Sequence, residues 1–177
     1  MNNENIIQLG DPRLRIQSKS VDKHRFGSAE LLELAEHLIS LMKKDKGVGL
    51  AAPQIGLNER IFVLGFEKNE RRPNEQPIPT TVVINPKIIP LSNEKEFGYE
   101  TCLSIGNGLT AKIPRFTKIA YQGFDPHGNI IEREVSGLHA RIVQHEYDHL
   151  EGIVFLDRVQ DTKTYGFYLE LKEAGLI

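Results

Sequence analysis

Residues 137–150, GLHARIVQHEYDHL, carry the pattern that decides the fold. Four apolar side chains recur at or near helical spacing along this segment: Leu138, Ile142, Val143 and Leu150. With Gly152 just beyond the end, the pattern predicts a helix that is buried centrally along its apolar side. On such a helix His145 and His149 lie one turn apart on the same face. The segment can therefore offer two imidazoles to a metal ion, and a third protein ligand must come from elsewhere in the chain.

The alternative for these histidines is that they satisfy each other in the core or point to water. Their apolar neighbours argue against it, because two buried imidazoles need partners and one shared metal ion serves both. Glu146 points about 100° around the helix from His145, which favours a base acting on metal-bound water over a ligand. We expect Asp148 to support this geometry, either by accepting an imidazole N–H or by pairing with a buried arginine, with Arg115 as the candidate. The remaining histidines carry no such pattern.

Outward from this helix, the sequence predicts an α+β fold with antiparallel sheets. Residues 28–45 form an amphipathic helix capped by Ser28 and stopped by Gly47. The residues DPHG at 125–128 join the last two strands into a hairpin, and 67–80 is a polar, Pro-rich loop. A short C-terminal helix is expected within 164–175. The expected strands are 60–66, 80–89, 117–125 and 129–135.

Composition limits the classes of function. The 177 residues are 40% hydrophobic and 26% charged, which indicates a single domain spanning residues 1–177. A net charge of −2 provides no basic field for nucleic acid or an anionic membrane, and no nucleic-acid motif is present. The N-terminal residues lack a signal or transit pattern, and no apolar run is long enough to span a membrane. We therefore expect a reducing cytoplasm as the compartment.

Two residues compete to be the third ligand. Glu170, in the expected C-terminal helix, would complete the site of a zinc endopeptidase. The other candidate is Cys102, the only cysteine, which follows an extended run and precedes a Gly-rich bend. A lone cysteine is also a common small buried hydrophobe, but a thiolate is a strong ligand for a divalent metal. The residues alone leave both alternatives open.

Three separated segments resemble the peptide deformylase family. They are GVGLAAPQIG at 47–56, ETCLS at 100–104 and QHEYDHLEG at 144–152. The resemblance extends in register to GDPRLR at 10–15, INP at 84–86 and IPR at 113–115, so it covers essentially the whole chain.

The resemblance implies antiparallel sheets around a central H-E-x-x-H helix, with the N-terminal helix packed outside. It implies one divalent ion, Fe²⁺ in preference to Zn²⁺ or Ni²⁺, held by Cys102, His145 and His149. The implied reaction is removal of the N-formyl group from formyl-methionine at the start of new polypeptides, by attack of metal-bound water. Glu146 would then move the proton, as general base and acid. By family analogy the side-chain amide of Gln54 and the backbone N–H of Leu103 meet the formyl oxygen.

The family pattern also assigns the substrate side of the site. Val48, Gly49 and Glu100 are expected to contact the peptide, while Leu138 and Ile142 line the methionine pocket or simply pack in the core. Arg141 lies one turn before His145 and either reaches the mouth of the cleft or lies in solvent.

One residue departs from the common family motif, because Thr101 stands where that motif has glycine. If the backbone there has positive φ, a β-branched residue is unfavourable; we expect an extended position, where Thr101 only narrows the cleft.

The partners implied are formyl-methionyl nascent peptides and a transient ribosome contact, with a monomeric protein in a bacterial cytoplasm. Two rival functions remain. One is the zinc endopeptidase that uses Glu170, and the other is a binding domain that keeps the motif without turnover.

Overall fold

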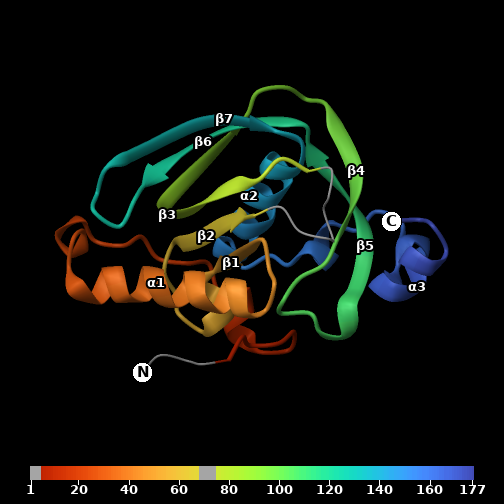
Figure 1. Ribbon diagram of the computed structural model, residues 1–177, viewed down its shortest axis with the longest axis horizontal. Helices are drawn as coiled ribbons and strands as arrows, with labels where there is room; N and C mark the ends of the chain where they lie inside the picture. Colours follow the sequence, from red (N-terminus) through yellow and green to blue (C-terminus); the bar gives the residue numbers. More distant parts are fainter. Residues whose placement is uncertain (1–4, 68–74) are drawn as a thin grey trace.

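The structure is a computed structural model that describes residues 5–67 and 75–177 (Figure 1). It is an α+β fold, and the pairs between its named strands are antiparallel, as the sequence predicts. The helices are α1 (Ala29–Lys44), α2 (Gly137–Leu150) and α3 (Tyr168–Glu173). The strands are β1 (Gly49–Ala51), β2 (Ile61–Phe66), β3 (Ile78–Pro90), β4 (Lys95–Glu100), β5 (Leu109–Phe116), β6 (Lys118–Phe124), β7 (Ile130–Ser136) and β8 (Gly166–Phe167).

The strands of the described residues form two sheets. A five-stranded sheet has the order β1-β2-β3-β6-β7, and a three-stranded sheet has the order β4-β5-β8. Strands β1 and β4 are therefore edge strands, because each stands at one end of its sheet. Short 3-10 helices complete the connections: η1 (Pro12–Arg15), η2 (Lys23–Arg25), η3 (Ala52–Ile55), η4 (Gly106–Gly108), η5 (Phe155–Arg158) and η6 (Thr162–Thr164).

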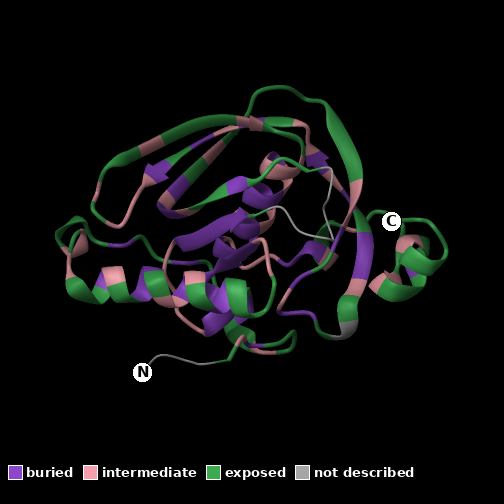
Figure 2. Ribbon diagram, viewed as in Figure 1, coloured by how far each residue is buried: buried purple, intermediate pink, exposed green. Residues whose placement is uncertain are grey.

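Both faces of the five-stranded sheet are covered at strand β2. Ile61 and Val63 pack with α1 on one face, while Phe62 and Leu64 pack with α2 on the other. This follows from the strand period of two, which sends successive side chains to opposite faces. Figure 2 shows β2 and much of α2 buried, whereas one side of α1 is exposed. Helix α2 is thereby held between this sheet and β5 of the smaller sheet.

The two long helices and the hairpin match the sequence predictions. Ser28 caps α1 by accepting a hydrogen bond from the Leu31 N–H. The β6–β7 turn is organised by Asp125, whose carboxylate accepts the backbone N–H groups of His127 and Asn129. Gly128 there has a φ of 88°, a value that glycine adopts without strain.

Four strands and one boundary differ from the sequence predictions. The short strands β1 and β8, and the β4–β5 pair, were not predicted as strands. The predicted loop at 67–80 ends earlier, because β3 already begins at Ile78; its residues 68–74 lie outside the described ranges. The C-terminal helix is confined to α3.

Candidate metal centre

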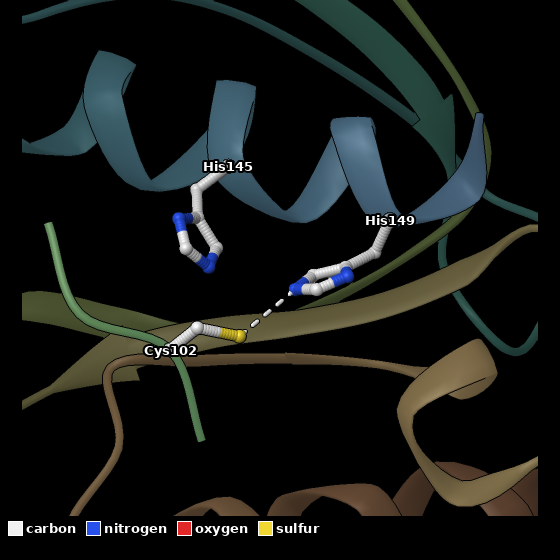
Figure 3. Close-up of side chains that lie close together, drawn as sticks. All are labelled: Cys102, His145 and His149. Atoms are coloured by element: carbon white, nitrogen blue, oxygen red, sulfur yellow. Dashed lines mark hydrogen bonds between the residues drawn. The ribbon is translucent and has the colours of Figure 1, made fainter. Parts of the chain in front are cut away.

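Three side chains converge beside α2, and their possible ligand atoms all lie within 4.8 Å of one another: Cys102, His145 and His149. The Cys102 Sγ is 3.3 Å from the His149 Nε2, and the two imidazole rings have centroids 5.2 Å apart. Figure 3 shows both imidazoles extending from α2 toward the cysteine. One thiolate and two imidazoles at this spacing match the ligand chemistry of a divalent transition-metal ion.

The local fold explains how these ligands meet. The two histidines are four residues apart on α2 and therefore share a face. Cys102 comes just after β4 ends at Glu100, at a turn where the Ile105 N–H donates to the Cys102 carbonyl. The cysteine is 8% exposed and packs with Ile113 and Phe155. The extended run expected before Cys102 is thus β4.

Glu170 is not brought to this cluster. It is exposed on α3, which contacts β8 at the edge of the molecule, and it is not part of the metal-binding group found among the described residues. The alternative with Glu170 as third ligand is therefore wrong, because the C-terminal segment packs on the outer side of the small sheet.

Glu100 fixes the orientation of His145. Its Oε2 lies 2.9 Å from the His145 Nδ1, so this nitrogen donates to the carboxylate. Arg115 and Arg141 donate to the same carboxylate, each at 2.9 Å. Burial alone would raise the pKa of Glu100, but the hydrogen bonds from Arg115 and His145 hold it well below its usual range. The Glu100 carboxylate is buried and committed to these three side chains, so the expected contact with the peptide remains a prediction for its backbone.

The predicted pairing of Asp148 with Arg115 is confirmed. The Arg115 guanidinium donates to the Asp148 carboxylate at 2.6 Å, and both side chains are buried. Arg115 therefore links Glu100 to Asp148 and ties β4 and β5 to α2. Arg158, half-exposed on η5, also donates to Asp148, at 2.8 Å. The helix that carries the histidines is anchored by a buried network of alternating charges.

Gln54 places its amide beside the cysteine. Its Oε1 accepts the Ala51 N–H at 2.8 Å, which turns its Nε2 toward the Cys102 Sγ at 3.5 Å and the Ser104 Oγ at 3.1 Å. Gln54 is 2% exposed, within η3. The amide is thus a fixed donor at the edge of the cluster.

Glu146 lies beside the same cluster with an uncommitted oxygen. The side chain is buried, and its Oε2 has no hydrogen-bond partner among the described residues. Burial raises the pKa of Glu146 to about 7, although the neighbouring His145 opposes that shift. A carboxylate that titrates near neutral pH can both take and return a proton, which is what a general base and acid requires.

The two histidines differ in their charge preference. Burial lowers the pKa of His149 well below its usual range, so the neutral imidazole offers a lone pair. For His145 burial also disfavours the charge, but hydrogen bonds with Cys102 and Glu100 raise its pKa well above its usual value. A metal ion bound by this set competes with that proton, because ligating imidazole must be neutral and ligating cysteine a thiolate. The donor set and the unpartnered Glu146 oxygen beside it fit a divalent metal.

The other predicted residues differ in their burial and contacts. Ile142 is buried, and Val48 and Leu138 are partly buried; all three pack in the cluster between α2 and the larger sheet. Leu103 is partly buried and its carbonyl accepts a hydrogen bond from the Gln8 side chain. Arg141 does not lie free in solvent, since it also donates to the carbonyls of Glu96, Gly98 and Ile113.

Thr101 is exposed, and its backbone is not strained. Among the described residues only Lys46 and Asn85 combine a side chain with a positive φ. The position beside Cys102 thus accepts a β-branched residue without conformational penalty.

Two residues of the site were missed. Ser104 stands within the ETCLS segment and holds the Gln54 amide; its place two residues after Cys102 was the available signal. Arg158 follows α2 in the 3-10 helix η5, and no spacing rule in the sequence indicates its contact with Asp148.

An α+β fold with a Cys-His-His cluster and a buried glutamate on an H-E-x-x-H helix defines a metallohydrolase. Comparison with known proteins identifies which one. The model of the polypeptide deformylase family matches residues 3–165. Peptide deformylase 2 of Pseudomonas putida is 45% identical over 171 residues, covering 97% of this chain and 95% of the relative. Peptide deformylase 1 of Xanthomonas campestris pv. campestris is 48% identical over 162 residues, covering 92% and 93%.

Solved structures agree. The Met-Ala-Ser-bound class I type b peptide deformylase of Acinetobacter baumannii superposes with a TM-score of 0.84 at 31% identity, over 88% of this chain and 97% of that one. The peptide deformylase of Thermotoga maritima superposes with a TM-score of 0.76 at 35% identity, over 89% and 97%. The chain belongs to the polypeptide deformylase family. It is a metal-dependent hydrolase that removes the N-formyl group from newly made polypeptides, and the rival reading as a non-enzymatic binding domain is wrong.

Proposed function

We propose that Cys102, His145 and His149 hold one divalent ion, Fe²⁺ in preference to Zn²⁺ or Ni²⁺, on a centrally placed α2. The single observation that carries this proposal is the convergence of one thiol and two imidazoles beside a buried carboxylate with a free oxygen. When bound, such an ion supplies Lewis-acid chemistry, which polarises a carbonyl group and makes water a stronger acid. Glu100 accepts a hydrogen bond from the His145 Nδ1–H, so the ring proton stays on Nδ1 and the lone pair of Nε2 is available to the metal.

Glu146 is the residue that moves the proton. Its Oε2 accepts the proton of the attacking water and returns it to the amine that leaves when the formyl C–N bond breaks. The burial of the carboxylate and a pKa of about 7 support both transfers at neutral pH.

Gln54 and Leu103 stabilise the negative charge that develops on the formyl oxygen. The Gln54 amide is aimed at the cluster by the Ala51 N–H, and Leu103 directly follows Cys102. Neutral donors suit this position because they do not compete for the metal. Loss of one such donor typically lowers kcat by about 10²–10³.

The substrate is a peptide that begins with formyl-methionine. The similar Acinetobacter baumannii enzyme has been solved with Met-Ala-Ser bound, which supports a short N-terminal peptide as the recognised segment. We assign the peptide contact to Val48 and Gly49 of the β1 region and the methionine pocket to Leu138 and Ile142. Because β1 and β4 are both edge strands, each has one edge that, among the described residues, pairs with no other strand of its sheet and with which the peptide backbone can pair.

The remaining proposals concern the setting of the enzyme. Residues 1–177 form one catalytic domain that acts as a monomer in a bacterial cytoplasm and meets the ribosome transiently, because its substrate is a nascent chain. No helix within the described ranges has the length and apolar character needed to cross a membrane.

The deciding experiment measures formate release from formyl-Met-Ala-Ser with the enzyme loaded with Fe²⁺ under anaerobic conditions. We expect turnover that is lost together with tight metal binding in Cys102→Ser. The matched control is Glu170→Gln, which should retain both metal and activity. Retention of tight metal binding in Cys102→Ser would contradict the ligand assignment.

A further inference from the structure

Gly49 of β1 lies directly against the side chain of Glu146. A Cβ atom built on Gly49 would overlap the Glu146 Oε1 and would lie 2.6 Å from its Cδ and 2.8 Å from its Cγ. Real Cβ atoms do not approach other heavy atoms this closely, so any side chain at position 49 displaces the carboxylate.

The backbone itself does not require glycine at this position. Gly49 is the first residue of a buried strand, pairs with Leu64 of β2, and is not among the glycines with positive φ. Glycine in a strand interior is unfavourable by about 0.5–1 kcal/mol relative to alanine. Space for Glu146, and not backbone conformation, is therefore the structural reason for glycine in β1.

Within the part of the chain that the structure describes, the Glu146 carboxylate lacks a hydrogen-bond partner on its Oε2. Its Oε2 is buried without a hydrogen-bond partner in the described ranges, in contrast to Glu100, which is held by two guanidinium groups and an imidazole. Strong donors on a proton-transferring carboxylate would lower its basicity. A steric wall can hold such a group in place without that effect.

We propose that Gly49 is a positioning residue for Glu146, and that the absence of a Cβ in β1 sets where the carboxylate lies relative to the Cys102, His145 and His149 cluster. The inference deepens the proposed function and rests on the role given there to Glu146. It differs from the peptide contact assigned to Gly49, because it acts through a side chain of the enzyme and not through the substrate.

The test compares Gly49→Ala, Glu146→Ala and the double variant, each loaded with Fe²⁺. Because the Glu146 side chain can swing away, Gly49→Ala should fold and keep its metal. A misplacement of about 1 Å at a reacting group can lower the rate about 10²-fold. We therefore expect Gly49→Ala to lose about 10²-fold in kcat for formate release from formyl-Met-Ala-Ser, with KM and metal content unchanged.

The double variant separates the two roles of Gly49. If Gly49 acts through Glu146, the double variant has the same kcat/KM as Glu146→Ala alone. A rise in KM without a loss of kcat in Gly49→Ala, or effects that multiply in the double variant, would overturn the proposal and leave Gly49 as a peptide contact only. Full activity of Glu146→Ala would instead contradict the proposed function.

Thermal unfolding supplies a readout that does not depend on activity. Gly49→Ala should lower Tm in the wild-type background, but not when Glu146 has been replaced by alanine, because the overlap is then removed. If Gly49→Ala fails to fold but the double variant folds, the same steric coupling is supported. If Gly49→Ala lowers Tm equally in both backgrounds, the space is not reserved for Glu146 and the proposal is wrong.

Discussion

Glu100, the last residue of β4, accepts a hydrogen bond from the His145 Nδ1 on α2 at 2.9 Å, across 45 residues of sequence. The same carboxylate binds Arg115 and Arg141, so one buried anion orients an imidazole of the candidate metal centre and ties the small sheet to the helix. If His145 is a metal ligand as proposed, metal binding and folding are coupled through Glu100.

This coupling predicts the effect of Glu100→Gln. The variant keeps the shape of the side chain but removes the charge that His145 and the two arginines share. Loss of a group that orients a ligating imidazole typically weakens metal affinity about 10–100-fold. Leaving a buried charge without its partner lowers the free energy of unfolding by about 3–5 kcal/mol. Metal content after equilibration with a chelator and urea unfolding of the metal-free protein measure the two effects.

The control for Glu100→Gln is Glu134→Gln on β7. Glu134 pairs with Lys118 at 2.9 Å, but both side chains are more than half exposed. Exposed pairs contribute about 0–1 kcal/mol, so this variant should change neither metal content nor unfolding. Equal effects of the two variants would contradict the role of Glu100.

The second prediction compares the two ion pairs that Asp148 forms with arginines. The side chain of its first partner, Arg115, is buried, whereas the side chain of its second partner, Arg158, is half-exposed. Asp148→Asn should lower the free energy of unfolding by about 3–5 kcal/mol because it leaves Arg115 buried beside a neutral group. Arg158→Gln should lower it by about 1 kcal/mol or less. Chemical denaturation measures the free energy of unfolding of both variants. Similar decreases in the two variants would show that burial does not set the strength of these ion pairs.

The sequence predicted the elements whose pattern is visible within a short stretch of residues. The apolar residues of α1 and α2 recur at helical spacing, and the DPHG turn marks its hairpin, so no tertiary information was needed. Strand β4 was predicted only as an extended run and β5 was missed, because Gly98 and Pro114 interrupt the alternation of these two strands.

The residues of the site likewise divide into those predictable from local spacing and those that depend on distant partners. The spacing of His145 and His149 placed two imidazoles on one face, whereas the choice between Cys102 and Glu170 needed the family resemblance. The role of Glu100 could not be predicted from spacing, because its partners lie 15, 41 and 45 residues away on two other elements. The acceptors of Arg141 could not be predicted for a related reason: these carbonyls belong to two strands that the sequence did not indicate as a pair.

Thr101 leads to the third prediction. The residue is exposed, has no positive φ and adjoins Cys102, so its side chain affects what fits beside the cluster and not the backbone that holds the cysteine. Thr101→Gly should leave metal content unchanged and change KM for formyl-Met-Ala-Ser, or the affinity of an active-site inhibitor. A tenfold change corresponds to about 1.4 kcal/mol. Loss of metal in this variant would show that Thr101 shapes the cysteine turn.

The last prediction concerns Gly98 of β4 and Arg141 of α2. A Cβ built on Gly98 would lie 2.7 Å from the Arg141 Cζ and 2.8 Å from its Nη2, so the guanidinium occupies the space of the missing side chain. From there Arg141 donates to the Ile113 carbonyl at 2.9 Å and to the Glu96 carbonyl at 2.8 Å, which fastens the edge strand to the helix. Gly98→Ala should therefore lower the free energy of unfolding by about 1–3 kcal/mol, as inserted methyl groups do in packed sites.

The size of the coupling between these two residues can be measured directly. In an Arg141→Ala background the space is empty, and Gly98→Ala should then be neutral or slightly stabilising, since alanine is favoured over glycine in a strand. The double-mutant cycle should yield a coupling of about 0.5–3 kcal/mol by urea unfolding. Metal content should stay unchanged throughout, because Arg115 still holds Glu100 beside His145. Additive effects would mean that Gly98 and Arg141 stabilise β4 independently, and metal loss in Arg141→Ala would mean that Arg115 alone cannot hold Glu100 in place.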